Sequence, residues 1–478
     1  MTPPTILSDP VRLEAMLGAY LAHHPAVAAL TATYRSAHRD LYLVGGAVRD
    51  LLLDRPVHEL DFATDAHPDE TERLLRRAGA TAVYGIGARF GTIGGNVHDT
   101  TVEITTYRSE TYRDGDRHPD VTFGTSLEGD LRRRDLTINA MAVDTHTGLL
   151  FDYAGGRDDL AQRVVRVVGD AEERFREDPL RLMRVVRLAT QLEFTIDPAT
   201  AAATQTMAPA LREVSRERVR DELTKVLLSA HPDVGVQRLA DLRLLTQITP
   251  PIDAMRGMVD PEKRQFKDLF KHTMTVLAGT PPDLVLRLAA LLHDVGKPRT
   301  YSNVDGEVHF FDHERVGAAI SRKLLTELRY DSAVIQGVVH LIDLHMRPAA
   351  DTDEWTDKAV RRFIVDVGVD NLETLFLLAG SDITSSNPRK VAAHLQRLER
   401  LRERCQRWLH EASVVKPQSP LDGHDLMDLF GGKQGPWIGK VKQYLLDLVV
   451  DGDLTEGDKE TARQLASAFV RDQGLLSV

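Results

Sequence analysis

The chain has little of three features that would each point to a particular class of protein. It contains one cysteine, Cys405, among 478 residues, which excludes an internal disulfide framework and a zinc site built from cysteines. No stretch approaches the roughly 18 uncharged apolar residues of a membrane helix, and the best candidate, 284–292, contains Arg287. The first ten residues, MTPPTILSDP, lack the basic and apolar runs of a signal peptide. We therefore expect a cytoplasmic protein without a membrane partner.

An excess of positive charge is also absent, because the formal net charge is −11. Binding to polynucleotides is driven largely by neutralising their phosphates, so proteins that coat nucleic acids are usually basic. Any such partner must here be bound by local patches. Two candidates are the arginines of 132–134 and those between 174 and 187.

What is present predicts a mixed α/β region followed by helices. Residues 9–38 and 47–53 have helical patterns. Short strands are expected at 41–44, 60–63, 92–94, 101–106 and 140–144. Beyond about residue 158 the strand patterns fade, and long helices are predicted at 174–193 and 216–230. Residues 413–420 are predicted to be a linker.

The first region combines a glycine turn with acidic residues on strands. Gly45 and Gly46 follow a strand and begin a helix, where backbone N–H groups can approach phosphate oxygens. Glu59 and Asp61 alternate on a strand and so share one face, and Glu103 lies on a later strand. Adjacent carboxylates repel unless a cation neutralises them, and Mg²⁺ prefers carboxylate and phosphate oxygens. The pattern predicts a two-metal site for nucleotidyl transfer.

Four ordered motifs in the first 190 residues carry a family resemblance. Residues 43–50 (LVGGAVRD) with 59–64 (ELDFAT) resemble the head motif of class II CCA-adding enzymes and bacterial poly(A) polymerases, which belong to the polymerase-β-like superfamily. Residues 133–140 (RRDLTINA) are similar to the family's motif for ribose and triphosphate. Asp152 with 155–160 resembles its hinge motif, and 177–181 (EDPLR) resembles its base-selecting motif.

The resemblance implies CTP, ATP and tRNA as partners, with no obligate protein partner, and Mg²⁺ bound by Glu59 and Asp61. Glu59, Asp61 and Glu103 would be the catalytic acids, although the family usually has Asp at the position of Glu59. The residues implied in nucleotide binding are Gly45, Gly46, Arg49, Arg134, Asp135, Asn139, Asp178, Arg181, Arg184 and Arg187.

Asp178 and Arg181 are three residues apart in a predicted helix and would share a face. They could form an intrahelical salt bridge, or an acceptor and donor pair that reads the edge of a base. The resemblance assigns them to the recognition of C and then of A. The polar segment 107–121 resembles the loop that moves when these enzymes switch from C to A.

Histidines and aspartates mark a second candidate site. The order of His272, His293, Asp294 and Asp382 resembles the HD superfamily of metal-dependent phosphohydrolases, which implies that these four bind one metal ion. Imidazole and carboxylate ligands suit a transition metal such as Mn²⁺ or Ni²⁺.

His313 and His345 could complete a second metal site. Related chains have a further histidine shortly after the position of His345, where this chain has 346–350 (MRPAA). Whether the chain binds a second metal ion therefore stays open. His340 is interpreted as a residue of a core helix.

The expected fold class is α+β: a polymerase-β-like nucleotidyltransferase head with a mixed sheet, followed by an all-α neck, an HD domain and a tail, as in the actinobacterial form of CCA-adding enzyme. The predicted domains are the head at 1–165, the neck at 166–250, the HD domain at 251–412 and a helical, tRNA-binding tail at 413–478.

The predicted function is template-independent addition of CCA to tRNA, with the HD domain a phosphohydrolase for 2′,3′-cyclic or 2′-phosphates. Three alternatives are a poly(A) polymerase, an enzyme that adds only CC or only A, and an HD phosphohydrolase with a nucleotide-sensing head.

Overall fold

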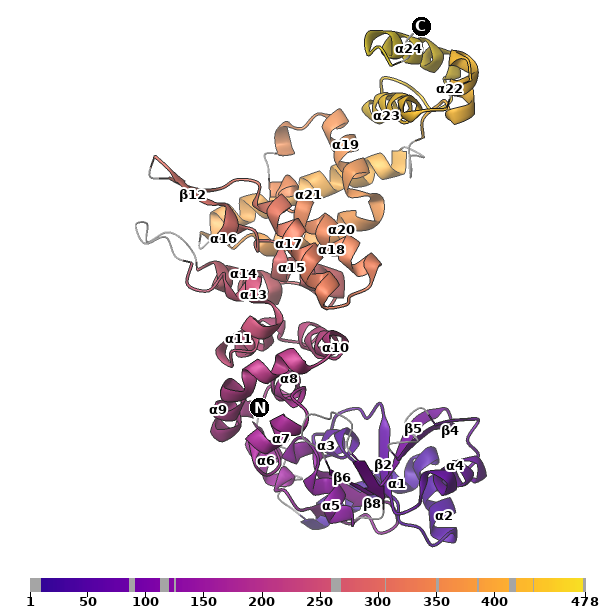
Figure 1. Cartoon of the computed structure of the whole chain (residues 1–478), viewed down its shortest axis with the longest axis vertical. Coiled ribbons are helices and arrows are strands. Elements are labelled where there is room, and N and C mark those ends of the chain that lie inside the picture. Colours follow the sequence, from indigo (N-terminus) through magenta and orange to yellow (C-terminus); the bar gives the residue numbers. More distant parts are fainter. Residues whose placement is uncertain are drawn as a thin grey trace. The chain divides into compact units, whose positions relative to one another are not determined.

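The computed structural model describes residues 10–85, 91–111, 120–123, 126–258, 268–305, 307–349, 352–384, 387–411, 418–432 and 434–475. The chain forms two compact units, Met1–Pro250 and Pro251–Val478, which Figure 1 colours from indigo to magenta and from red to yellow. Among the residues that the structure describes, no helix has both the length and the apolar character needed to cross a membrane.

A seven-stranded sheet forms the centre of the first unit, in the order β3-β4-β5-β2-β1-β8-β9. Its strands are β1 (Tyr42–Val44), β2 (Leu60–Thr64), β3 (Ala82–Tyr84), β4 (Thr92–Val97), β5 (Thr100–Thr106), β8 (Met141–Asp144) and β9 (Leu150–Asp152). β2 and β5 are parallel, whereas the other neighbours are antiparallel. The prediction of a mixed sheet is confirmed.

Helices cover this sheet and fix the turn beside its acidic residues. α5 (Leu127–Arg132) packs Leu127 and Leu131 against Val44, Ala63 and Ala142 of the strands. Between β1 and α3 (Gly46–Leu52), Gly45 has a φ of +73°, a conformation that favours glycine. The pattern at 9–38 forms two helices, α1 (Pro10–His23) and α2 (Pro25–Ser36), because Pro25 begins the second.

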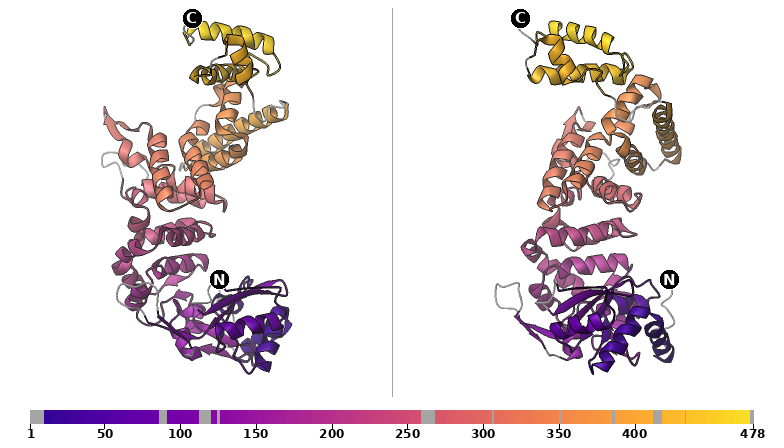
Figure 2. Two further views of the ribbon diagram at one scale, coloured as in Figure 1. Left: turned by 45° about the vertical axis from the view of Figure 1, so that its right-hand side comes forward. Right: turned by 90° about the vertical axis from the view of Figure 1, so that its right-hand side faces the viewer.

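The rest of the first unit is a succession of packed helices (Figure 2). They are α4 (Pro68–Arg77) near the sheet, then α6 (Gly156–Gln162), α7 (Ala171–Glu177), α8 (Arg181–Gln191), α9 (Pro198–Met207), α10 (Arg216–Leu227), α11 (Pro232–Asp241) and α12 (Leu245–Ile248). The single helix predicted at 174–193 is wrong. Asp178 is extended, because a residue before proline avoids the helical conformation, and it separates α7 from α8.

The neck is not purely helical, since β10 (Val164–Val165) pairs in parallel with β11 (Thr195–Ile196). In the second unit, a hairpin of β12 (Tyr301–Val304) and β13 (Glu307–Phe310) was also missed by the sequence analysis. The all-α expectation for both regions is corrected in these two places.

The helices of the second unit pack around a buried group of histidines. They are α13 (Pro250–Asp253), α14 (Leu269–Ala278), α15 (Leu284–Leu292), α16 (Lys297–Thr300), α17 (His313–Glu327), α18 (Ser332–Leu344), α19 (Asp357–Val367), α20 (Val369–Asp382) and α21 (Pro388–Glu411). α15 is buried along almost its whole length, which explains its nearly continuous apolar sequence.

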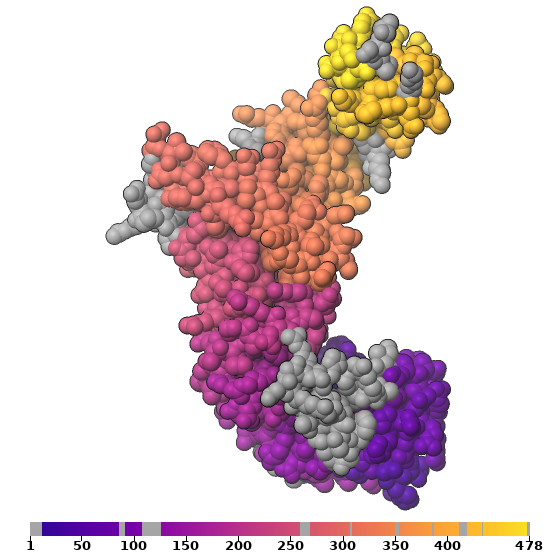
Figure 3. Space-filling view, in the orientation of Figure 1, coloured from indigo at the N-terminus to yellow at the C-terminus, as the bar shows by residue number. Residues whose placement is uncertain are grey.

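The tail has its own small core, and Figure 3 shows it as a rounded lobe. Its helices are α22 (Gly423–Phe430), α23 (Pro436–Asp451) and α24 (Lys459–Asp472). Leu426, Trp437, Val441 and Ala466 are buried between them. Of the predicted linker 413–420, residues 413–417 lie outside the described residues.

Candidate active sites

The acidic residues of the head lie next to the glycine turn. Asp61 on β2 is directly opposite Glu103 on the parallel strand β5, and Glu59 immediately precedes β2. A Cβ atom added to Gly45 would lie 3.7 Å from a carboxylate oxygen of Asp61 and 3.2 Å from the guanidinium of Arg134. The tertiary structure therefore brings together a glycine turn, an arginine and a group of carboxylates.

Mutual repulsion makes this group a suitable ligand set for a cation. Glu59 and Glu103 are exposed, whereas Asp61 is half-buried. Burial, and then the charges of Glu103 and Glu59, raise the pKa of Asp61 to about 6, although Arg134 opposes the shift. A divalent cation bound to these oxygens would remove the repulsion, so the residues fit the Mg²⁺ that the resemblance implies.

Arginines and acids connect the motifs of the head. Arg49 donates to Asn139 at 2.8 Å, Asn139 donates to Asp135 at 3.4 Å, and Arg184 of α8 donates to Asp135 at 2.6 Å. Burial opposes the charge of Asp135, but the Arg184 guanidinium outweighs it and lowers the pKa of that carboxyl. This network positions two predicted nucleotide-binding motifs, 43–50 and 133–140, relative to helix α8.

Asp130 holds the arginines of the second motif and was missed by the sequence analysis. It is 1% exposed and accepts from Arg133 at 2.5 Å and from Arg134 at 3.2 Å. Within the described residues, the buried Nε of Arg134 makes no hydrogen bond, so it is a donor available to a ligand. The three- and four-residue spacings in a short helix were the signal that could have identified Asp130.

The predicted base-selecting pair is differently arranged from the expectation. Asp178 and Arg181 do not share one helix, and each has another partner: Arg218 donates two hydrogen bonds to Asp178, and Arg181 pairs with Glu177 at 2.5 Å. The expectation that the two residues share one helical face is therefore wrong, and the alternative of an intrahelical salt bridge between them is not observed either. Arg187 of the same helix pairs with the buried Glu222.

The predicted switching loop is described only at its ends. β6 (Arg108–Thr111) pairs antiparallel with β7 (Asp120–Phe123), so the segment contains a strand pair that the loop prediction did not include. Residues 112–119, with Gly115, Arg117 and His118, lie outside the described residues.

In the second unit, the four predicted ligands lie together. The Nε2 atom of His272 lies 3.3 Å from Nε2 of His293, 3.5 Å from Asp294 and 3.0 Å from Asp382. His293 and Asp294 are 0% and 1% exposed. Donor atoms this close in a buried position fit a transition-metal ion.

His313 and His345 form a second group on the other oxygen of Asp294. Their Nε2 atoms lie 3.5 and 4.0 Å from Asp294 Oδ1. All three atoms are buried and have no hydrogen-bond partner in the described part of the chain. Because an unpaired buried polar atom is unfavourable, this arrangement fits a second ion, which Asp294, His313 and His345 would hold.

Backbone and hydroxyl groups orient the rings. Nδ1 of His293, His313 and His345 lies 2.7–2.9 Å from the carbonyl oxygens of Ala290, Phe310 and Ile342, and Nδ1 of His272 lies 2.8 Å from the hydroxyl of Thr384. A proton on each Nδ1 leaves Nε2 as the free ligand atom, as in many metal sites.

The charges of neighbouring residues shift the pKa values of the histidines in this cluster. Burial disfavours a charged His293, but Asp294 and Asp382 outweigh burial and raise its pKa to about 10. Burial, and then repulsion from His293, lower the pKa of His345 to about 4. Lys297 pairs with Asp294 at 2.7 Å. Gly296 permits this close packing, because a Cβ there would overlap the carbonyl oxygen of His313.

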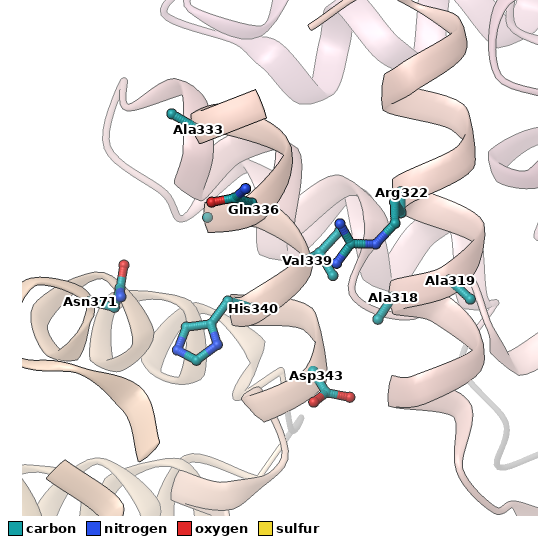
Figure 4. Close-up of a pocket in the computed structure, with 10 residues that line it drawn as sticks. Ala318, Ala319, Arg322, Ala333, Gln336, Val339, His340, Asp343 and Asn371 are labelled. Carbon is teal, nitrogen blue, oxygen red and sulfur yellow. The ribbon is translucent and has the colours of Figure 1, made fainter. Parts of the chain in front are cut away.

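His340 lies outside both groups of candidate ligands among the described residues. Its Nε2 is 2.8 Å from the carbonyl oxygen of Val367. Figure 4 shows it with Arg322 and Asp343 around a pocket of about 840 Å³. Its side chain is half-buried beside this pocket, rather than fully within the core.

Comparisons with known proteins match the chain in three segments. Residues 41–166 match the family model of the poly(A) polymerase head domain, and 193–256 match that of a probable RNA- and SrmB-binding site of polymerase A. Residues 272–374 match the HD domain.

The curated relatives include CCA-adding enzymes of three bacteria. Those of Enterococcus faecalis, Levilactobacillus brevis and Bacillus subtilis are 42%, 45% and 44% identical over 41%, 43% and 44% of this chain. These alignments span 47%, 51% and 52% of the relatives, so the chain matches about half of their length.

Solved structures extend the likeness of fold to nearly the whole chain. The CCA-adding enzyme of Bacillus stearothermophilus, in complex with CTP, aligns over 94% of this chain and 98% of its own, with a TM-score of 0.67 and 24% identity. That of Thermotoga maritima, in complex with tRNA, aligns over 95% and 98%, with a TM-score of 0.56 and 19% identity. The chain thus has the fold of a nucleotidyltransferase head with a mixed sheet, followed by a helical neck and an HD domain.

Proposed function

We propose that this protein adds CCA to the 3′ end of tRNA from CTP and ATP without a nucleic-acid template. The observation that carries the proposal is the placement of Asp61 opposite Glu103, beside the Gly45 turn and Arg134. The match to the poly(A) polymerase head domain, over residues 41–166, includes these residues. A cytoplasmic location, the actinobacterial form and the absence of an obligate protein partner stay predictions.

The residues of the head have complementary roles in this reaction. The 3′-hydroxyl of tRNA loses its proton to solvent as its oxygen forms a bond to the α-phosphorus of the nucleotide. The bond from the α-phosphorus to the oxygen shared with the β-phosphate breaks, and pyrophosphate leaves. Mg²⁺ held by Glu59, Asp61 and Glu103 would supply charge neutralisation at the reacting phosphate. The N–H groups at the Gly45–Gly46 turn and the free Nε of Arg134 would bind triphosphate oxygens. The network from Arg49 to Arg184 would hold the ribose and base in place.

Incubation with tRNA that lacks its CCA end, plus each labelled nucleotide, tests this function. We expect C, C and A to be added in that order and addition to stop. A long tail of A would favour a poly(A) polymerase, and addition of only CC or only A would identify a partial enzyme. Absence of any product would contradict the proposal and favour a nucleotide-sensing head.

A second activity is proposed for the HD domain, hydrolysis of 2′,3′-cyclic or 2′-phosphates. The observation that favours it is the pair of ligand groups sharing Asp294. A transition metal bound there would polarise a phosphate and lower the pKa of water. Lys297, which pairs with Asp294, would supply a positive charge beside the phosphate. The test is hydrolysis of 2′,3′-cyclic AMP after metal removal and addition of Mn²⁺, Ni²⁺ or Mg²⁺, with the double variant His293→Ala/Asp294→Ala as control.

A further inference from the structure

The edge of the head sheet brings an exposed tyrosine into line with the acidic residues. Asp61 on β2 is paired with Glu103 on β5, and Glu103 is paired with Gly94 on β4. Gly94 is in turn paired with Tyr84 on β3. Residues that are paired directly across a sheet point to the same face. The side chains of Tyr84, Glu103 and Asp61 therefore form one row on the face of the carboxylate group.

Gly94 leaves the space that the tyrosine ring occupies. A Cβ atom added to Gly94 would lie 2.1 Å from a ring carbon of Tyr84, so the ring lies against this glycine and extends from β3 towards β5. Neighbouring strands are about 4.8 Å apart, which puts the ring roughly one strand spacing from the backbone of Glu103. A glycine inside a strand often marks such a close approach.

The ring is on the open face of these strands. The other face is covered by α4, because a Cβ atom on Gly95 would lie 3.4 Å from the side chain of Leu75. Leu60 and Val102, which are in register with Gly95, are buried on that covered face. Tyr84, by contrast, is 38% exposed. One side of its ring is therefore packed on the sheet, and the rest is available to a ligand beside the acids.

The row of side chains also has a direction with respect to the reaction. The Gly45 turn and the guanidinium of Arg134, which would bind the triphosphate, lie on the β1 side of Asp61. In an in-line displacement, the attacking oxygen and the leaving pyrophosphate are on opposite sides of the α-phosphorus. The attacking end of the tRNA is therefore expected on the β5 and β4 side of the acids, where the ring of Tyr84 lies.

We propose that Tyr84 is a stacking platform for the base of the terminal nucleotide of tRNA, whose 3′-hydroxyl attacks beside Glu103. The inference rests on the proposed nucleotide addition and assigns the acceptor side of the same site. Stacking on an aromatic ring is tolerant of base identity, because every base has a π-face. Such tolerance suits an acceptor whose terminal base changes with each nucleotide that is added.

Steady-state kinetics with tRNA that lacks its CCA end distinguish the acceptor from the incoming nucleotide. We expect Tyr84→Ala to raise KM for tRNA roughly 5- to 100-fold, which is the usual contribution of one stacked base, while KM for CTP stays unchanged. Tyr84→Phe should behave like wild type, because the ring and not the hydroxyl binds the base. Tyr84→Leu keeps apolar bulk against Gly94 but has no π-face, so it should behave like Tyr84→Ala.

A modified tRNA and a matched variant separate stacking from support of the strand. When the terminal nucleotide of the tRNA is replaced by 1-deoxyribose, both hydroxyls remain but the base is absent. Wild type and Tyr84→Ala should extend this tRNA equally well. The control variant is Val83→Ala, which removes a half-buried side chain from the opposite face of the same strand. It should leave KM for tRNA unchanged even if it lowers stability.

A binding assay keeps the inference independent of nucleotide addition. The probe is a tRNA that ends in fluorescent 2-aminopurine, which stacking quenches. Quenching by wild type and Tyr84→Phe, but not by Tyr84→Ala, would establish the platform even if the wild type added no nucleotide and the proposed function failed. The platform is wrong if wild type does not quench the probe, or if Tyr84→Ala extends normal tRNA like wild type. It is also wrong if Tyr84→Ala loses as much on the tRNA without a terminal base, or if KM for CTP rises instead.

Discussion

In the head, buried acids are paired with arginines, whereas in the described part of the HD domain several polar atoms of the metal-ligand candidates are buried without a hydrogen-bond partner. Asp130 and Asp135 each have an arginine, and the carboxylates of Glu59 and Glu103 are exposed to water. In contrast, Asp294 Oδ1 and the Nε2 atoms of His313 and His345 make no hydrogen bond among the described residues. The comparison predicts that a bound metal would stabilise the HD cluster, whereas the paired acids of the head do not require one.

The largest expected effect concerns activity in the head. We expect Asp61→Ala to reduce nucleotide addition by roughly 1,000-fold or more, about 4 kcal/mol, because a ligand for the catalytic cation is lost. The unfolding transition should stay within about 1 °C of wild type, since removing one of three repelling acids is not destabilising. The measurement is extension of tRNA lacking CCA, with the exposed Asp69→Ala as control. Near-normal extension by Asp61→Ala would show that the carboxylate group is not the catalytic site.

A second variant tests whether arginine pairing organises the head. Asp130→Asn should lower the free energy of unfolding of the first unit by about 3 kcal/mol, because two arginines lose a buried partner. The control is Glu128→Gln, whose ion pair with Arg132 is exposed and worth at most about 1 kcal/mol. Equal losses in the two variants, measured by urea denaturation, would contradict the interpretation.

The lowered pKa of Asp130 predicts how pH affects the stability of the first unit. Burial opposes its charge, but Arg134 and Arg133 outweigh it and lower its pKa below the usual 3.8. A lowered folded-state pKa stabilises the protein above the unfolded-state pKa, and this stabilisation is lost as the pH falls through the folded-state value. The stability difference between wild type and Asp130→Asn should therefore be constant from pH 5 to 7 and shrink below about pH 4.

Metal removal tests whether a bound cation stabilises the HD cluster of the second unit. Mn²⁺ at 100 times its dissociation constant should stabilise the second unit by about 2.7 kcal/mol, and chelation should reverse this. The transition of the first unit should move less, because its carboxylates suit Mg²⁺ that is bound together with nucleotide phosphates. Calorimetry of wild type and of His293→Ala/Asp294→Ala distinguishes the units, because the variant should lose the shift. A Mn²⁺ shift retained in that variant would place the metal elsewhere.

The smallest effects are expected in base choice. Asp178→Ala or Arg181→Ala should relax the preference for CTP by about ten- to a hundredfold, or 1–3 kcal/mol, while triphosphate binding changes less. The measurement is competition among the four nucleotides on tRNA that ends before the first C. Arg218→Ala sharpens the test, because Arg218 holds Asp178 in the structure without belonging to the predicted pair. Unchanged preference in all three variants would mean that base choice lies with other residues.

The sequence alone determined the residues that carry the proposed chemistry. Contiguous motifs such as 43–50 and 133–140 predicted the head, because a strand, a tight glycine turn and a helix are specified by neighbouring residues. The spacing of histidines and aspartates predicted the HD cluster, although its members come from α14, from the residues that directly follow α15, and from α20. A ligand set is limited to few residue types, so it can be identified even when its members are far apart.

Only the tertiary structure decided which of these residues face one another. It showed that Asp178, which precedes Pro179, lies outside the helix of Arg181. It also showed that Arg218 pairs with Asp178 and Glu177 with Arg181. Asp294 proved to be shared by two groups of candidate ligands. Another feature that it showed is the hairpin of β12 and β13, which the sequence analysis did not predict. Such contacts depend on how distant elements pack, and packing between distant elements leaves no periodic pattern in the sequence from which pairwise contacts could be predicted.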